Sequence, residues 1–204
     1  MKIIGLCGSS GSGKGYVSKI FEKYGIPCID TDKLYREKTI KKGTPCLNEL
    51  VKEFGTRVLT KDGELDRRKL ASIVFEGENS NAMLEKLNKI THRYIKLDTE
   101  KLLDAYEKEG KIATVIDAPV LFESGFDKMC DITVAVIAPY EIKLGRIILR
   151  DEITKEKAEA RLKSQMLDDE LIKRTTYQID NSNIDVEAQI IEILKKEQIY
   201  EKER

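Results

Sequence analysis

The chain has 204 residues, with 36 basic and 36 acidic side chains, a formal net charge of +0 and an apolar fraction of 41%. This length and apolar content predict one globular domain with a packed core, and the balanced charge argues against a nucleic-acid-binding or membrane-surface protein. The sequence shows neither a signal-peptide pattern nor an apolar run of membrane-spanning length, which predicts a cytoplasmic location.

The first predicted element is a buried strand over residues 3–7, which runs into the glycine-rich loop Gly8-Ser9-Ser10-Gly11-Ser12-Gly13-Lys14. The glycines let successive backbone NH groups turn toward phosphate oxygens, and the following helix points its positive end at the same anion. Lys14 would contact the β- and γ-phosphates, so this P-loop pattern predicts binding of a nucleoside triphosphate. The alternative is a strand-to-helix turn that holds no ligand.

One position departs from the full P-loop pattern. The residue after the lysine is normally Ser or Thr, which holds Mg²⁺, but this chain has Gly15 followed by Tyr16. We expect triphosphate binding to survive this change more easily than the placement of the metal.

A second strand, over residues 26–29, is followed by two carboxylates. Asp32 is predicted to accept or orient the proton of an attacking hydroxyl, and Asp30 to help hold metal-bound water. Arg36 is four residues beyond Asp32, on the same helical face, where it would meet an acceptor phosphate. The simpler alternatives are that Asp32 or Thr31 caps a helix, and that Asp32 and Arg36 form a plain helix pair.

The stretch from about residue 33 to residue 110 is too long for one crossover helix and predicts a helical insertion that walls a cleft facing the P-loop. Helices are expected over residues 33–41, 45–54, 66–75 and about 81–109, the last with Ser80 as its N-cap and Gly110 as its stop. His92 and Arg93 lie in the middle of the long helix. They either play a structural role or meet a phosphate together.

Three further strands are predicted over residues 112–116, 132–137 and 177–179, before a surface helix that spans residues 186–204. Asp117 follows the third strand, where it either orients Mg²⁺ through water or is simply a helix cap or a turn residue. Arg146 and Arg150 are four residues apart on one helical face, as either a solvated pair or the arginines of a lid over the triphosphate.

Near-continuous apolar runs separated by helices predict an α/β fold, a parallel five-stranded sheet with helices on both faces, with a helical insertion and a lid. We expect a core of residues 1–32, 111–138 and 176–204, an insertion over residues 33–110 and a lid over residues 139–175. The four cysteines lack Cys-x-x-Cys spacing and the chain has one histidine, which favours buried reduced thiols over a zinc site.

Taken together, these motifs resemble the dephospho-CoA kinase family over almost the whole chain. The resemblance rests on several matches in the same order: Gly8 to Lys14, Ile29-Asp30-Thr31-Asp32 with Arg36, Phe54-Gly55, Asp62-Gly63-Glu64-Leu65-Asp66-Arg67, Val74-Phe75, Leu87 to His92, Asp117-Ala118-Pro119-Val120-Leu121-Phe122-Glu123, Arg146, Arg150-Asp151, Gln165 and Ile179-Asp180-Asn181. The resemblance implies ATP-dependent phosphorylation of the ribose 3′-hydroxyl of dephospho-CoA to give coenzyme A and ADP, with Mg²⁺.

The resemblance also implies roles for individual residues. Catalysis is assigned to Asp32 as the base and to Lys14, Arg146 and Arg150. ATP is assigned to Gly8, Gly11, Ser12, Gly13, Lys14, Gly15, Tyr16 and Asn181. The acceptor is assigned to Asp32, Arg36, Arg67, His92, Arg93, Asp117 and Glu123, and the metal, through water, to Asp117.

Three motifs depart from the family pattern, which has Lys-Ser-Thr at Lys14-Gly15-Tyr16, His-Pro at His92-Arg93 and Ala-Asp at Thr175-Thr176. The alternatives to this activity are another P-loop small-molecule or nucleoside kinase, and a catalytically weak nucleotide-binding relative made credible by Gly15. A GTPase switch is disfavoured because Asn88-Lys89-Ile90-Thr91 lacks the aspartate that reads guanine.

Overall fold

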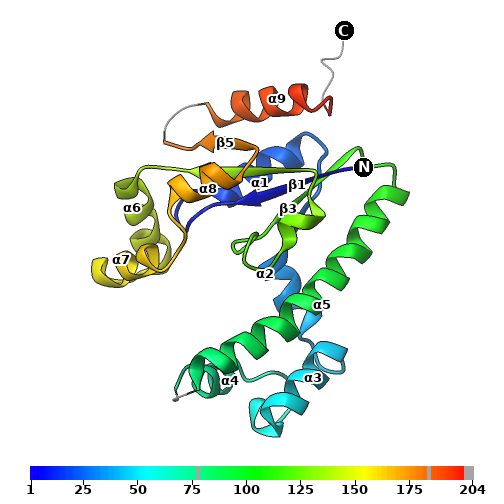
Figure 1. The fold of residues 1–204 in the computed structure, drawn as a ribbon, viewed down its shortest axis with the longest axis vertical. Coiled ribbons are helices and arrows are strands. Elements are labelled where there is room, and N and C mark those ends of the chain that lie inside the picture. The colour runs from blue at the N-terminus through cyan, green and yellow to red at the C-terminus, as the bar shows by residue number, and fades with distance from the viewer. Residues whose placement is uncertain (77–78, 183–184, 200–204) are drawn as a thin grey trace. The chain divides into compact units, whose positions relative to one another are not determined.

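The computed structural model describes residues 1–76, 79–182 and 185–199. The chain divides into two compact units (Figure 1). The first, called here the sheet unit, comprises Met1–Ile29 and Tyr106–Arg204, and the second, the helical unit, comprises Asp30–Ala105. The predicted division into core, insertion and lid stays a prediction.

The sheet has five strands: β1 (Lys2–Cys7), β2 (Cys28–Asp30), β3 (Ala113–Asp117), β4 (Ile132–Ile137) and β5 (Tyr177–Asp180). They are parallel and run in the order β2-β3-β1-β4-β5, with Leu6 opposite Asp117 and Cys7 opposite Ala135. β1 is the central strand, and the loop that begins at Gly8 follows its carboxyl end. Because the strands are parallel, the carboxyl ends of the neighbouring strands β3 and β4 lie at the same edge of the sheet as this loop. The predicted α/β fold class is confirmed.

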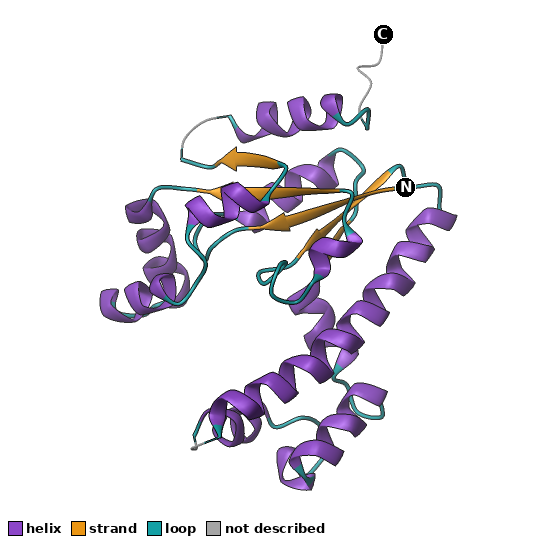
Figure 2. Ribbon diagram, viewed as in Figure 1, coloured by secondary structure: helices purple, strands orange, loops and turns teal. Residues whose placement is uncertain are grey.

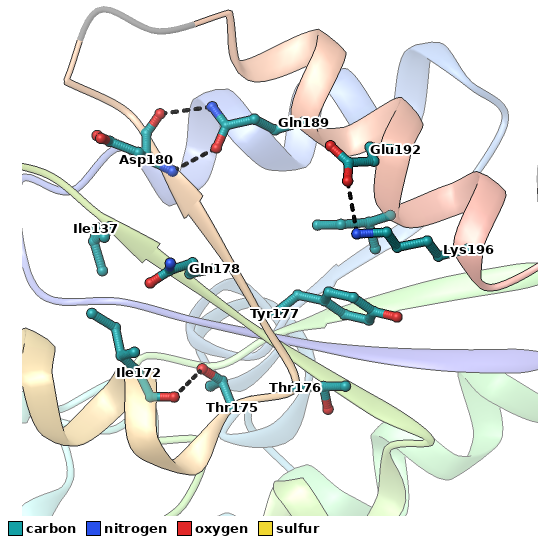
Figure 3. A pocket seen from close by; sticks show the side chains of 11 residues that line it. Ile137, Ile172, Thr175, Thr176, Tyr177, Gln178, Asp180, Gln189, Glu192 and Lys196 are labelled. Atoms are coloured by element: carbon teal, nitrogen blue, oxygen red, sulfur yellow. Dashed lines mark hydrogen bonds and ion pairs between the residues drawn. The ribbon is translucent and has the colours of Figure 1, made fainter.

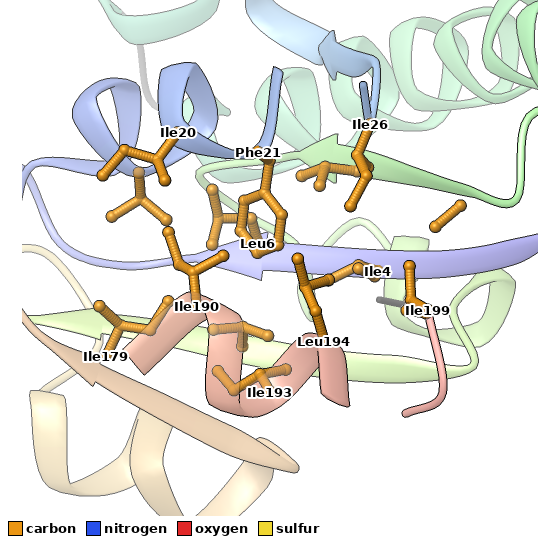
Figure 4. Close-up of a cluster of buried hydrophobic side chains, with 14 of the residues drawn as sticks. Ile4, Leu6, Ile20, Phe21, Ile26, Ile179, Ile190, Ile193, Leu194 and Ile199 are labelled. Atoms are coloured by element: carbon orange, nitrogen blue, oxygen red, sulfur yellow. The ribbon is translucent and has the colours of Figure 1, made fainter. Parts of the chain in front are cut away.

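One face of the sheet packs against helices α1 (Lys14–Lys23) and α9 (Val186–Lys196). Ile4 and Leu6 of β1 point to this face and pack against Phe21 of α1 and Leu194 of α9 (Figure 4). All four side chains are fully buried. This packing anchors α1, whose first residue is Lys14, directly on the strand that leads into the loop.

The opposite face is covered by the segment that follows β3. Gly5 of β1 faces it, because a Cβ at Gly5 would lie 2.8 Å from Cys130 Sγ and 3.1 Å from Leu121 Cδ2. This segment includes the short helix η3 (Phe126–Met129). Helices α6 (Tyr140–Asp151), α7 (Lys155–Lys163) and α8 (Asp168–Arg174) connect β4 to β5 (Figure 2).

The helical unit contains α2 (Thr31–Leu34), η1 (Tyr35–Thr39), α3 (Pro45–Phe54), η2 (Thr56–Val58), α4 (Arg67–Phe75) and most of α5 (Ser80–Lys108). Its own core gathers Leu50 and Phe54 of α3, Val74 of α4 and Ile90 of α5. Thr44 caps α3 by accepting a hydrogen bond from the Leu47 backbone at 3.3 Å.

Several predicted boundaries change. The stretch predicted to be helical over residues 33–41 is helical over residues 31–39, but it is not one regular α-helix, because α2 ends at Leu34 and a π-helical turn, η1, follows. Ser80, expected as an N-cap, is itself the first residue of α5. The last helix ends at Lys196 instead of continuing to residue 204, and residues 200–204 lie outside the described part of the chain.

In the part of the chain that the structure describes, no helix is both long enough and apolar enough to cross a bilayer.

Candidate active site

The loop after β1 requires its glycines. Gly11 and Gly13 have φ of +79° and +97°, where side chains are strained. A Cβ at Gly13 would lie 2.0 Å from Asn181 Nδ2, one at Gly11 would lie 2.5 Å from the Lys143 carbonyl oxygen, and one at Gly8 would lie 2.5 Å from the Val136 carbonyl oxygen. The loop is therefore wound tightly against β4, α6 and the residue after β5.

Gly15 is different from these three glycines. It is exposed and lies in the first turn of α1, and beyond its chain neighbours and the backbone of its own helix no atom lies within 4 Å of the position that a Cβ would take. A serine would therefore fit there without a steric conflict, and the backbone does not explain why this chain has glycine.

The side chain of Lys14 folds back over the loop. Its Nζ donates a hydrogen bond to the Gly8 carbonyl oxygen at 3.1 Å. Helix α1 starts from Gly13 in the left-handed conformation, which turns the chain so that the helix N-terminus and the lysine share one concave loop. Inside it, Ser12 Oγ is buried and has no hydrogen-bond partner among the described residues.

Arg146 and Asn181 hold this loop from outside. Arg146 Nη1 donates to the carbonyl oxygens of Gly11 and Ser12, each at 3.2 Å, and Nη2 donates to the Asn181 carbonyl at 3.0 Å. The Asn181 amide donates to the Ser12 carbonyl at 2.8 Å. Both residues, predicted from the sequence, are thus at the loop, with their polar atoms engaged by its backbone.

Arg150 lies one helical turn beyond Arg146 and is exposed. Its guanidinium pairs with Asp151 at 2.8 Å and also donates to Ser10 Oγ at 3.2 Å. The hydrogen bonds that Arg150 donates to Asp151, together with the contact of Arg161 with the same carboxylate, lower the pKa of Asp151 to about 2. The carboxylate is therefore ionised at neutral pH and orients Arg150 toward the loop.

The sequence reasoning missed a partly buried ion pair at the loop. Lys143 Nζ lies 2.8 Å from Asp168 Oδ2 and 3.1 Å from Ser9 Oγ. The side chain of Gln165 accepts a hydrogen bond from the Ser10 backbone at 2.8 Å. A signal existed for Lys143, which precedes Arg146 by three residues and so shares its helical face.

Asp117 stands at the end of β3, beside the end of β1 in the sheet. One carboxylate oxygen, Oδ2, accepts a hydrogen bond from Ser18 Oγ in α1 at 3.2 Å. Ser18 is one turn beyond Gly15 and is buried. The structure therefore ties the predicted metal-orienting carboxylate to the helix that follows the loop, and Ser18 was another residue that sequence reasoning missed.

A cavity of about 120 Å³ lies beside the loop. It is lined by Cys7, Gly8, Ser9, Pro119, Val120, Leu121, Phe122, Glu123, Ser164, Gln165, Met166 and Leu171. Glu123, predicted to contact the acceptor, is therefore next to the loop, and Arg174 lies over the ring of Phe122 at 4.0 Å. Burial raises the pKa of the Cys7 thiol to about 12, so this thiol is not a nucleophile.

Asp30 and Asp32 belong to the helical unit. Asp30 is the N-cap of α2 and accepts a hydrogen bond from the Lys33 backbone at 2.8 Å. The capping role considered for Asp32 or Thr31 is therefore filled by Asp30. Asp32 is exposed in the first turn, and Arg36 is exposed in the π-helical turn that follows, a type of irregularity that is common at functional sites.

The other predicted acceptor residues lie on α4 and α5 of the helical unit. Arg67 is the first residue of α4 and is exposed. Arg93 pairs with Glu49, which also accepts a hydrogen bond from Tyr94 at 2.8 Å. Burial, with a smaller contribution from Lys96, lowers the pKa of His92, so its imidazole is neutral at pH 7.

A larger pocket, of about 510 Å³, runs along β5, α8 and α9 (Figure 3). Several of its polar side chains are engaged with neighbouring groups: Gln189 bonds the Asp180 backbone at 2.9 Å, and Lys196 pairs with Glu192 at 2.7 Å. None of the residues predicted from the sequence to form the site lines this pocket. We therefore place the site at the loop and not here.

A central strand that feeds a glycine loop, a lysine folded over that loop and a parallel sheet in the order 2-3-1-4-5 define a P-loop protein with a kinase-like fold. A family model described as dephospho-CoA kinase matches residues 2–187. The chain therefore belongs to the dephospho-CoA kinase family.

Individual relatives agree with this assignment. The dephospho-CoA kinase of Bacillus cereus is 39% identical over 195 residues, which are 95% of this chain and 96% of the relative. That of Fusobacterium nucleatum is 42% identical over 185 residues, covering 89% of this chain and 90% of the relative. The solved dephospho-CoA kinase from Campylobacter jejuni is 27% identical, has a TM-score of 0.67 and covers 96% of this chain and 97% of its own.

Proposed function

We propose that this protein transfers the γ-phosphoryl group of ATP to the ribose 3′-hydroxyl of dephospho-CoA, giving coenzyme A and ADP. Membership of the family supports the reaction. The observation that carries it is the loop geometry, with left-handed Gly13 at the start of α1 and Lys14 Nζ 3.1 Å from the Gly8 carbonyl oxygen. On binding, Lys14 would exchange this carbonyl for phosphate oxygens, which are better partners for an ammonium group.

Residues around the loop would bind and neutralise the triphosphate. Backbone NH groups of the segment from Gly8 to Tyr16 would face the phosphates, and Ser12 Oγ would gain a partner. Arg150, exposed and oriented by Asp151, would contact the transferring group, while Arg146 would keep the loop in shape through its three bonds to backbone carbonyls. Such preorganised charge supplies most of the catalysis in phosphoryl transfer.

We assign the role of base to Asp32. It is an exposed carboxylate in the first turn of α2, one turn before Arg36, and Asp30 fills the N-cap position of that helix. It would accept the proton of the 3′-hydroxyl as the new P–O bond forms, and ADP would leave on the opposite side. Arg36, Arg67, His92, Arg93, Asp117 and Glu123 stay as candidates for contacts with the acceptor.

The donor groups suit Mg²⁺. The Asp117 carboxylate is a hard oxygen ligand at the end of β3, and Ser18 fixes its orientation at 3.2 Å. Asp117 would hold the metal through water, with the remaining ligands from the phosphates. Bound there, Mg²⁺ would offset charge on the β- and γ-phosphates.

One observation favours a second candidate, a nucleotide-binding relative with weak catalysis. Gly15 leaves an open space where a hydroxyl would fit, so the metal loses one direct ligand. This candidate would bind ATP but convert it to ADP only slowly, whichever acceptor is present.

We also propose a cytoplasmic location. Its support is that Cys7, Cys28, Cys46 and Cys130 are all free thiols, the state that a reducing compartment maintains. Fractionation of cells that express the protein, with recovery outside the cytosolic fraction, would contradict this proposal.

The reaction is tested by measuring ADP release with ATP, Mg²⁺ and either dephospho-CoA, adenosine or no acceptor. We expect kcat/KM for dephospho-CoA to exceed that for adenosine by about 10²-fold or more, since the larger acceptor offers more binding energy to the transition state. Comparable rates with both acceptors would favour a nucleoside kinase, and ATP binding without acceptor-dependent turnover would favour the weak relative.

A further inference from the structure

A partly buried ion pair lies against the first half of the glycine loop, between Lys143, which is buried, and Asp168, which is half-buried. Lys143 of α6 is 8% exposed, and its Nζ lies 2.8 Å from Asp168 Oδ2 of α8. The same Nζ donates to Ser9 Oγ at 3.1 Å, and Ser9 Oγ donates to Asp168 Oδ1 at 3.1 Å. The three side chains thus close a ring of hydrogen bonds on a residue of the loop.

We propose that Lys143 and Asp168 are positioning residues, which hold Ser9 and so keep the loop in the shape that binds ATP. The inference rests on the proposed binding of ATP by this loop and goes beyond it, because neither residue is expected to touch the nucleotide. The ring of Lys143, Asp168 and Ser9 is called the loop clamp below.

The first argument is chemical. Burying an ammonium group is costly unless a carboxylate and further hydrogen-bond partners compensate. Apolar residues in place of such an ion pair would generally stabilise the fold at least as well, so stability alone does not explain the pair. Lys143 has both kinds of compensation, and its second partner is a side chain of the loop. The polar groups of this ion pair therefore hold one particular residue of the loop, Ser9, in place.

The second argument is steric. A Cβ at Gly11 would lie 2.5 Å from the Lys143 carbonyl oxygen and 2.9 Å from its Cα, so the backbone of α6 at Lys143 is packed directly on the loop. The side chain of Lys143 then reaches Ser9, which precedes Gly11 by two residues. One residue of α6 therefore contacts the loop through both its backbone and its side chain.

The third argument is that the next loop residue, Ser10, is held by side chains from the same part of the chain as Lys143 and Asp168. The backbone NH of Ser10, next to Ser9, donates a hydrogen bond to the Gln165 side chain at 2.8 Å, and Ser10 Oγ accepts one from Arg150 at 3.2 Å. All these partners come from the segment between β4 and β5. The loop is thus held by the same segment that carries the candidate catalytic Arg150.

The consequence for ATP follows from entropy. A loop whose NH groups already face the phosphate position loses little conformational freedom on binding, and the saved free energy appears as affinity. Without the loop clamp, Ser9 and the peptide units beside it would sample other conformations. Ordering the loop would then cost free energy on ATP binding, which would weaken the affinity for ATP but not the affinity for the acceptor.

The test compares three variants and a control. Ser9→Ala removes the hydroxyl but leaves the ion pair whole, Lys143→Met breaks the pair, and Lys143→Met/Asp168→Leu replaces it by apolar groups. Lys173→Met, at an exposed lysine of α8, is the control. For each protein, calorimetry gives the Kd for ATP, thermal unfolding gives the Tm, and kinetics give the KM for dephospho-CoA.

We expect Ser9→Ala and the double variant to raise the Kd for ATP by about tenfold, with Tm near that of the parent and an unchanged KM for dephospho-CoA. Lys143→Met should raise the Kd at least as much and also lower Tm, because it leaves Asp168 unpaired. Lys173→Met should change none of these quantities.

A double variant that regains both Tm and ATP affinity would overturn the proposal, since the pair would then be only structural. So would Ser9→Ala with a Kd within twofold of the parent, a result that remains decisive if Lys143→Met does not fold. If the parent protein itself fails to bind ATP, the proposed function is at fault and not the loop clamp alone.

Discussion

Ser18 Oγ donates a hydrogen bond to Asp117 Oδ2 across 3.2 Å, from the second turn of α1 to the end of β3. In the usual P-loop the hydroxyl that serves the metal follows the lysine directly, and here that position is Gly15. The hydrogen bond fixes the carboxylate that we assign to magnesium-bound water. In the proposed mechanism, the link between Ser18 and Asp117 would help to place the metal beside a loop that lacks the standard ligand.

Gly15→Ser is expected to lower the Mg²⁺ concentration that gives half-maximal rate by several-fold or more, because it restores a direct oxygen ligand. The site has room, with no atom within 4 Å of the new Cβ. The measurement is a Mg²⁺ titration of ADP release at saturating ATP and acceptor. Gly15→Ala is the control, since it adds the Cβ without a hydroxyl. An equal shift in both variants would mean that the effect is not metal ligation.

Asp32→Asn is expected to lower kcat by about 10²-fold or more while the Kd for ATP and the KM for dephospho-CoA change little, because the amide cannot accept the proton. Steady-state kinetics with calorimetric ATP binding check this. Asp104→Asn, at an exposed residue of α5 in the same unit, is the control and should retain full rate. Full turnover in Asp32→Asn would remove Asp32 from the mechanism.

The two arginines of α6 are expected to respond differently to the same change. Arg146→Met should lower the free energy of unfolding by about 2 kcal/mol, because three charge-assisted bonds to backbone carbonyls are lost. Arg150→Met should cost less than about 1 kcal/mol, as its partners are at the surface, yet reduce kcat strongly. Urea unfolding and kinetics of both variants test the contrast, and equal losses of stability would contradict it.

The stability of the protein is expected to fall as the pH drops below about 6.5. Burial lowers the pKa of His92 from its ordinary value of 6.5, so the unfolded chain binds a proton at a pH where the folded chain does not. Stability is then full above pH 6.5 and declines as the pH falls from there toward the lower folded pKa. Urea midpoints at pH 7.5, 6.5 and 5.5 measure this effect.

His92→Gln is the matched variant, since His92 is the one histidine of the chain and its loss removes all imidazole titration. Its midpoint should vary less over the same pH range. A parent and a variant with parallel pH profiles would show that His92 titrates alike in the folded and unfolded states.

The sheet could be predicted from the sequence because its strands are short, near-continuous apolar runs. The run over residues 132–137 became β4 with the predicted bounds, and the other strands shifted by one or two residues at their ends. The loop could be predicted because glycines and a lysine at fixed spacing have one well-known use. The local pattern therefore predicted the fold class, which is confirmed, while the binding of ATP by the residues of the loop stays a prediction.

The rest depended on contacts between distant residues. Lys143 meets Asp168 and Ser9 across 25 and 134 positions of sequence, and no local periodicity encodes such pairs. The sequence showed Arg146 as an arginine on a helical face, but only the packing of α6 on the loop turned its guanidinium toward backbone carbonyls. The π-helical turn after α2 likewise has no composition signal that separates it from an α-helix.

The most direct test of the account is to identify the phosphorylated product. The protein is incubated with ATP, Mg²⁺ and dephospho-CoA, and the acceptor is then analysed by mass spectrometry and phosphorus NMR. The account predicts ADP together with an acceptor that carries one added phosphate on its ribose 3′-oxygen. ADP with free inorganic phosphate and unmodified dephospho-CoA, or a phosphate on another hydroxyl, would contradict it.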